Sequence, residues 1–306
     1  MDLHDLALRD KKIFDRYLSL SVHELSVYNF TNIYIWKNLF RIRWKIIDES
    51  LCVFFQDKFG AFLYLSPLAK ELKPAVVKKI FLFLGRLNTN PEISRIENAE
   101  EKEASLYRDL GYKVVLKSTE YLCRRQDLVQ LSGNVFKAKR ASVNFFLKTY
   151  GYTFVPYTKK DHTACLKLYK LWAESRGKNR PDVLYQGMLG DSLNSLGCLL
   201  RDFSALDCVG RVVRVNREIK GFTFGFPLNE TTFCILYEIT DLEIKGLAQF
   251  IFQEFCREQK KYSQINIMDD SGLENLKKVK LSYHPEKMVP AYIIQQKDAQ
   301  GTYNLK

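Results

Sequence analysis

This 306-residue sequence lacks long apolar runs, and its longest purely apolar stretches are about five residues, such as residues 80–84. A membrane-spanning helix needs about 20 apolar residues, so none is predicted. The first residues show no basic stretch followed by an apolar one, so no secretory signal is expected. A hydrophobic content of 46%, with 13% aromatic residues, excludes a disordered chain.

Histidine is scarce and cysteine is scattered. The four histidines are isolated from one another, no cysteines form a Cys-x-x-Cys pair, and their number, seven, is odd. Neither zinc-ligand spacing nor a disulfide framework is therefore expected. We predict a reduced, cytoplasmic protein with buried free thiols, no metal site and no tightly bound cofactor.

Acidic residues are outnumbered, since 47 Lys and Arg against 35 Asp and Glu give a net charge of +12. Such a surplus raises affinity for polyanions and accelerates the encounter with them. RNA, an anionic membrane surface and a phosphate-bearing donor all fit this charge. Plain solubility fits it equally well, so charge alone does not identify the partner.

The length predicts two domains. The hydrophobic pattern of residues 153–295 predicts a strand, two helices, three antiparallel strands, a long helix, a strand, a helix and a final strand. Residues 11–125 repeat most of this order, which is that of the GCN5-related N-acetyltransferase fold. We predict a mixed α/β protein with two tandem domains of this type, residues 1–126 and 151–306. Basic connecting helices would occupy residues 127–150.

A turn at residues 240–248 lies between the third strand and the long helix of the second copy. Its small residues, Gly246 and Ala248, let backbone N–H groups face an anion, as in the turn of N-acetyltransferases that holds the coenzyme A pyrophosphate. Lys245 adds a cation, whereas Glu243 replaces the usual leading Gln or Arg. Close packing of the helix against a strand explains the glycine equally well.

The passage NIMDDSGLENLKKVKLSYHP begins at residue 266. Lys277, Lys280 and Tyr283 recur at intervals of three, so they lie near one helical face. Lysines there can hold a phosphate or a carboxylate, and a tyrosine can give a proton to a departing group. Asp269 and Asp270, at a strand end, can bind an ammonium. A solvated helix face is the alternative.

A basic helix is predicted from about residue 134, and it carries Lys137, Lys139 and Arg140 without an acid. Arginine offers a fork for phosphate oxygens, while lysine acts as a point charge. The phenylalanines of this segment either pack in the core or form a stacking surface for RNA bases.

Three passages resemble the C-terminal catalytic domain of phosphatidylglycerol lysyltransferases. They are YLCRRQDLVQLSGNVFKAKRASVNFF from residue 121, LYEITDLEIKGLAQFIFQEF from residue 236, and the passage from residue 266. SVYNFTNIYIWK, from residue 26, resembles the opening of soluble homologues of that domain. The resemblance implies a tandem acetyltransferase-like fold that transfers an aminoacyl group from aminoacyl-tRNA to a lipid or to a small amine or hydroxyl acceptor.

The resemblance also implies a division of roles. Tyr283, Asp270 and Glu238 are the candidate catalytic residues, and Asn266 and Asp269 line the pocket. The candidate donor- or phosphate-binding residues are Lys137, Lys139, Arg140, Lys245, Gly246, Lys277 and Lys280.

The sequence departs from the family pattern at several positions. Ile239 and Ile267 stand where the family has a basic residue and an arginine, and Asn275 replaces a glycine. Three alternatives therefore stay open: an acyl-CoA-dependent N-acyltransferase, a catalytically inactive binding protein with the same fold, and a nucleic-acid-binding module. Peripheral attachment to the inner membrane face, held by charge, is a further expectation.

Overall fold

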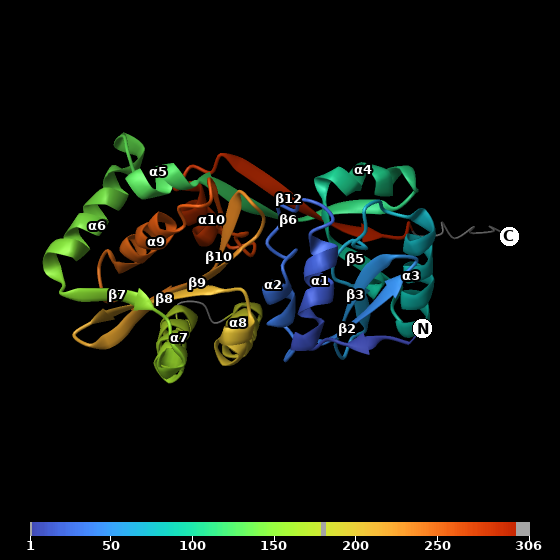
Figure 1. Cartoon of the computed structure of the whole chain (residues 1–306), viewed down its shortest axis with the longest axis horizontal. Coiled ribbons are helices and arrows are strands. Elements are labelled where there is room, and N and C mark those ends of the chain that lie inside the picture. The colour runs from blue at the N-terminus through green and yellow to red at the C-terminus, as the bar shows by residue number, and fades with distance from the viewer. Residues whose placement is uncertain (1, 179–181, 298–306) are drawn as a thin grey trace. The chain divides into compact units, whose positions relative to one another are not determined.

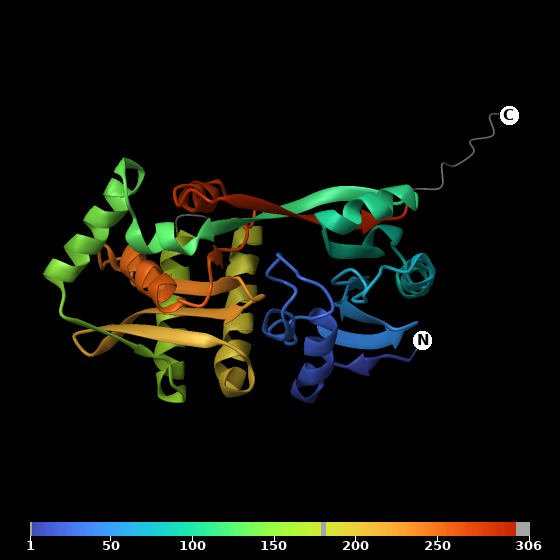
Figure 2. The same cartoon turned by 45° about the horizontal axis from the view of Figure 1, so that its top comes forward.

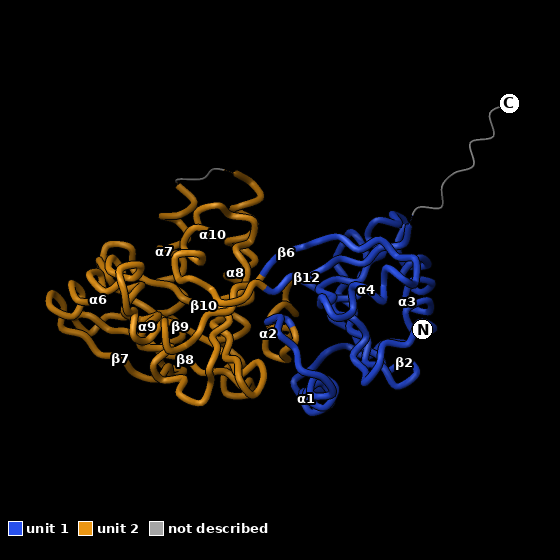
Figure 3. Tube along the Cα trace, turned by 90° about the horizontal axis from the view of Figure 1, so that it is seen from above, with its two compact units in different colours: residues 1–27, 40–119, 289–306 blue, residues 28–39, 120–288 orange. Residues whose placement is uncertain are grey.

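The computed structural model describes residues 2–178 and 182–297 (Figure 1). The described residues divide into two compact units (Figure 3). Unit 1 contains residues 2–27, 40–119 and 289–297, and unit 2 contains residues 28–39 and 120–288. Among the helices of this part of the chain, none is long and apolar enough to cross a membrane.

Unit 1 is built on an antiparallel strand triplet followed by a helix and a parallel strand. Its elements are β1 (His4–Asp5), α1 (Lys11–Leu18), β2 (Arg41–Ile47), β3 (Ser50–Gln56), β4 (Ala61–Leu63), α3 (Pro74–Leu87), β5 (Arg95–Glu100) and α4 (Glu101–Asp109). Pro74 occupies the first turn of α3, where its missing N–H costs nothing. The apolar face of α3, from Val76 to Leu84, is buried against the sheet because its residues recur at helical spacing.

Unit 2 repeats this order on a larger scale. Its elements are α2 (Phe30–Tyr34), α5 (Arg125–Gln130), α6 (Lys137–Thr149), β7 (Tyr152–Pro156), α7 (His162–Lys178), α8 (Val183–Asp202), β8 (Val209–Val215), β9 (Glu218–Pro227), β10 (Thr232–Thr240), α9 (Leu247–Glu258), β11 (Gln264–Asn266) and α10 (Glu274–Leu281). Its strands follow the order β11-β10-β9-β8-β7, in which only β10 and β11 are parallel.

Helices cover both faces of the sheet of unit 2. Figures 1 and 2 show α7 and α8 on one side of β8–β10 and α9 on the other, with α5 and α6 packed outside α9. The apolar side of α9 is fully buried at Leu247, Ile251 and Phe255, which form the core with residues of the strands and of α6. The first turn of α6 lies beside the residue that follows α10, since Lys139 donates to Ser282.

The predicted division at residues 126 and 151 differs from these units in three places. The last strand, β12 (Lys287–Gln295), pairs with β5, so residues 289–295 complete the sheet of unit 1. The end of β6 (Lys113–Arg124) pairs with β11, so residues 120–124 complete the sheet of unit 2. The last strand of the second copy, β12, therefore completes the sheet of unit 1, and the end of the last strand of the first copy, β6, completes the sheet of unit 2. Local sequence patterns do not reveal such long-range pairing. Residues 28–39 likewise belong to unit 2.

Candidate active site

Strands β10 and β11 are paired over only three residues and then part. Their parallel register runs from Thr232 with Gln264 to Cys234 with Asn266. β10 continues to Thr240, with an irregularity between Ile235 and Tyr237 that shifts its register against β9. We call this place, beyond Asn266, the β10–β11 split. Ligands of α/β proteins commonly bind beyond the carboxyl ends of parallel strands.

Glu238 lies on β10 beyond the irregularity. Its side chain is half-buried, but its Oε2 atom is buried and has no hydrogen-bond partner within the described residues. Burial raises the pKa of this carboxyl to about 8, against the opposing charges of Lys280 and Lys139. A buried carboxyl without a partner is costly, so its presence points to chemistry rather than to stability.

Two lysines from different helices face this carboxyl. Lys139, on α6, donates to the Ser282 hydroxyl at 2.8 Å, and Lys280, on α10, donates to the carbonyl of Ile267 just beyond β11. Burial lowers the pKa of both ammonium groups, against the raising effect of Glu238 on Lys139 and of Asp269 on Lys280. Lys280 on α10 thus contacts the backbone just beyond β11, and Lys139 comes from a different helix, α6.

Tyr283 follows α10 and is nearly buried, at 8% exposure. Its ring contacts Phe252 of α9 with centroids 4.3 Å apart, and the Lys139 ammonium lies 3.6 Å from the centroid of the Tyr283 ring. Burial, reinforced by the charge of Glu238, holds the pKa of the Tyr283 phenol well above its usual value. The phenol therefore stays protonated and is available as a donor.

The polar floor of the split is formed with the end of β6. Asn266 is fully buried, and its amide donates to Glu120 at 2.6 Å. Tyr121 donates to Asp270 at 2.5 Å, and burial together with this carboxylate raises the pKa of Tyr121 to about 12. The sequence interpretation gave Glu120 and Tyr121 no role. The sequence feature that could have indicated a role is Glu120, a carboxylate directly beside the apolar end of a long predicted strand.

Three of the proposed cations lie apart from this cluster. Lys137, Lys245 and Lys277 are exposed, and the Lys245 ammonium rests 4.8 Å from the ring centroid of Phe145. Their phosphate contacts stay predictions.

Arg140 has a structural task. It donates to the carbonyl of Leu131 and, at 2.6 Å, to that of Gly133, so it fixes the loop between α5 and α6. Sequence alone did not predict this use of the guanidinium, because it depends on Leu131 adopting a left-handed conformation, with φ of 48°. Its expected contact with phosphate stays a prediction.

Gly246 lies at the start of α9 with φ of +84°, in the left-handed region that favours glycine. A Cβ there would lie 2.1 Å from the Ser142 carbonyl oxygen of α6. The close approach of α6, a helix and not the strand of the packing alternative, therefore accounts for this glycine. Contact of Gly246 with a phosphate stays a prediction.

The arrangement combines a carboxyl whose pKa is raised to about 8, two ammonium groups and a protonated phenol. Such a set can accept a proton from a nucleophile and stabilise a developing oxyanion. The described residues contain no group of three or more His, Cys, Asp or Glu side chains placed to hold a metal ion.

Comparison with solved structures identifies the fold. A conserved protein of unknown function from Bacteroides thetaiotaomicron is 26% identical, with a TM-score of 0.85 over 97% of this chain and 100% of that one. L-PGS from Bacillus licheniformis gives a TM-score of 0.67 at 15% identity, over 94% and 92% of the two chains. A tandem GNAT protein of the clavulanic acid biosynthesis pathway gives 0.52 at 7% identity, over 95% and 97%. The predicted tandem acetyltransferase-like fold is confirmed.

The family follows from the sequence match. No curated protein matches this chain. Residues 20–295 match the family model described as phosphatidylglycerol lysyltransferase, C-terminal. Family and fold together support an acyltransferase. The match spans most of both units, and the chain therefore belongs to the family of phosphatidylglycerol lysyltransferase C-terminal domains.

Proposed function

We propose that this protein transfers an aminoacyl group from aminoacyl-tRNA to the hydroxyl or amine of a lipid or small acceptor at the β10–β11 split. The observation that carries the proposal is Glu238, whose buried Oε2 atom has no hydrogen-bond partner within the described residues and whose carboxyl interacts with the charges of two lysines. A base with a pKa near the working pH is the best compromise between being deprotonated and holding a proton strongly.

In the proposed reaction, the acceptor oxygen or nitrogen attacks the ester carbonyl of the aminoacyl group. A bond forms from the acceptor to the carbonyl carbon, and the ester bond to the ribose oxygen breaks. Glu238 takes the acceptor proton, which returns to the departing ribose oxygen. Lys139 or Lys280 stabilises the oxyanion, and the protonated Tyr283 donates to it or to the leaving oxygen.

The donor's phosphates require cations outside the split. Lys137 on α6 and Lys277 on α10 are exposed, and both helices also carry a lysine of the catalytic cluster. Exposed cations on the helices that carry Lys139 and Lys280 suit a long polyanion whose end enters the split. An acyl-CoA donor is less supported, because the Ser142 carbonyl lies against Gly246, where the pyrophosphate would be held.

A donor assay tests the proposal. Purified protein is incubated with labelled bulk aminoacyl-tRNA or with labelled acetyl-CoA, each with a cell extract as acceptor source. Transfer from tRNA alone supports the proposal, and the labelled product identifies the acceptor. Transfer from acetyl-CoA alone would replace it with an N-acyltransferase, and transfer from neither would favour a binding protein.

Glu238→Gln separates chemistry from binding in the same assay. We expect it to lower transfer by at least about 100-fold while tRNA binding, measured by filter retention, stays unchanged. The double variant Lys137→Ala, Lys277→Ala should instead affect binding. We expect it to weaken tRNA binding and to flatten the salt dependence of that binding. Unchanged binding across a salt series would assign these two lysines to solvent.

A further inference from the structure

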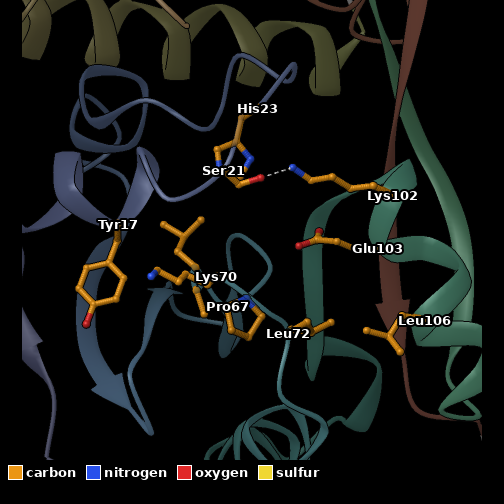
Figure 4. A pocket seen from close by; sticks show the side chains of 11 residues that line it. Tyr17, Ser21, His23, Pro67, Lys70, Leu72, Lys102, Glu103 and Leu106 are labelled. Atoms are coloured by element: carbon orange, nitrogen blue, oxygen red, sulfur yellow. Dashed lines mark hydrogen bonds between the residues drawn. The ribbon is translucent and has the colours of Figure 1, made fainter.

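Unit 1 contains the same kind of split as unit 2, and a cavity lies beside it. β4 pairs with β5 in parallel through Leu63 and Ile96. Beyond the carboxyl ends of both strands lies a cavity of about 260 Å³ (Figure 4). The loop after β4 and helix α4 after β5 form two of its walls, and the segment after α1 closes it.

The cavity presents both signs of charge, but only one of its two lysines is available. Lys102 donates to the Ser21 hydroxyl and to the Val22 carbonyl, both at 2.8 Å, and pairs with Glu100 at 2.9 Å. Lys70 is exposed and has no hydrogen bond or ion pair among the described residues. Its ammonium can therefore bind an anionic group of a ligand.

The acid of the cavity is Glu103, on α4. It is half-buried, and it accepts a hydrogen bond from the backbone N–H of Glu100 at 3.2 Å. Burial raises the pKa of Glu103, and it outweighs the lowering effects of a hydrogen bond with Ser66 and of the charge of Lys102. In Figure 4 its carboxyl and the Lys70 side chain enter from different walls. A ligand ammonium in the cavity would add an opposite charge to this carboxyl.

The remaining lining is apolar except for Tyr17 and for His23, whose ring is hydrogen-bonded to Glu100 at 2.8 Å, and the space is small. Leu72 comes from the loop after β4, and Leu106 lies one turn beyond Glu103 on α4. At about 260 Å³ the cavity is slightly below the range of drug-sized sites, about 300–1,000 Å³. It therefore suits a molecule of amino-acid size with a hydrocarbon side chain.

We infer that unit 1 binds a small zwitterion, a free amino acid with an apolar side chain. Its carboxylate would pair with Lys70, its ammonium with Glu103, and its side chain would contact Leu72 and Leu106. This site lies within unit 1 and is separate from the proposed chemistry of Glu238. It stands or falls independently of the donor of the transfer reaction.

Calorimetric titration of the full chain tests the inference with three matched probes. Leucine carries both charges, 4-methylpentanoate lacks the amine, and 3-methylbutylamine lacks the carboxylate. We expect leucine to bind at one site at least tenfold more tightly than either single-charge probe. No leucine binding, or equal binding of leucine and 4-methylpentanoate, would overturn the inference.

Variants assign the binding to residues. Glu103→Gln keeps an acceptor for the Glu100 N–H and should erase the preference for leucine over 4-methylpentanoate. Lys70→Ala should weaken both by at least tenfold, whereas Lys78→Ala, another exposed lysine of unit 1, should change neither. Thermal melts without ligand verify folding of each variant. Leucine binding that Glu238→Gln removes and Lys70→Ala leaves intact would place the ligand in unit 2 and contradict the inference.

Discussion

The two splits differ in how each treats its buried acid. In unit 1, Glu97 on β5 is paired with Lys117 at 2.5 Å and with Arg95 at 2.6 Å. Burial works against its charged form, yet the two cations hold the pKa of Glu97 below its ordinary value. In unit 2, the Oε2 of Glu238 has no hydrogen-bond partner in the described chain, and its pKa is raised to about 8.

The strand ends are also closed differently. In unit 1, the Asn98 amide donates to the Tyr64 carbonyl at 2.9 Å and accepts from Lys117 at 2.8 Å, so the polar groups satisfy one another. In unit 2, Lys280 donates to a carbonyl and leaves the carboxyl of Glu238 unbonded. The same topology can therefore hold two kinds of carboxylate. A carboxylate with cationic and hydrogen-bonding partners is structural, and one without a hydrogen-bond partner is reactive.

The largest expected difference between the two acids, Glu238 and Glu97, is in their effect on catalytic turnover. Glu238→Gln should lower kcat of the transfer reaction by at least about 100-fold, because general acid–base catalysis contributes roughly 10²–10⁴-fold. Glu243→Gln, an exposed acid in the turn before α9, is the matched control and should leave kcat unchanged. A Glu238→Gln enzyme with full activity would show that this carboxyl is not the base.

Stability should respond in the opposite way. Glu97→Gln should destabilise the protein by about 2 kcal/mol at pH 7, because it strands two half-buried cations. Since the folded pKa of Glu97 is depressed, its contribution is complete above the unfolded pKa and is lost as pH falls through the folded one. The loss should therefore shrink in acid. Urea unfolding of both proteins at pH 7 and pH 4 checks this.

For Glu238, the dependence of stability on pH has the opposite sign. Its folded pKa is raised, so the folded state binds the extra proton and stability declines as pH rises from the ordinary pKa of 4.5 through about 8. Glu238→Gln should flatten that decline and raise the Tm by a few degrees above pH 8. The activity of the unaltered protein should rise through an apparent pKa of about 8. An activity limb that persists in Glu238→Gln would identify another group.

A matched pair of glycines tests the packing that positions Lys139. Gly246 and Gly111 have nearly the same φ, +84° and +85°, but a Cβ meets Ser142 only at Gly246. Gly111→Ala should cost about 1 kcal/mol from backbone strain alone. Gly246→Ala should cost roughly 1–2 kcal/mol more, since α6 must shift. Equal losses in denaturant unfolding would mean that α6 is not held against α9 at this point.

Much of the fold was predictable from local pattern. The apolar face of α3 and the long apolar side of α9 recur at helical spacing, and the strand triplets of both units alternate between short breaks. The order of elements therefore indicated the tandem fold before any contact was known. The exchange of β6 and β12 between units was not predictable, because strand pairing partners far apart in sequence leave no local trace.

The candidate site likewise has features that the sequence predicts and features that only the tertiary structure determines. Sequence determined which residue types were available: a glutamate on the third strand, lysines on two helices, and a tyrosine after the last of them. Tertiary structure alone decided that Glu238 lacks a partner, that Lys139 lies over the Tyr283 ring, and that Arg140 holds a loop. The reason is physical: burial and charge neighbours set the pKa of a side chain, and the two lysines that act on Glu238 stand 42 and 99 positions away in the chain.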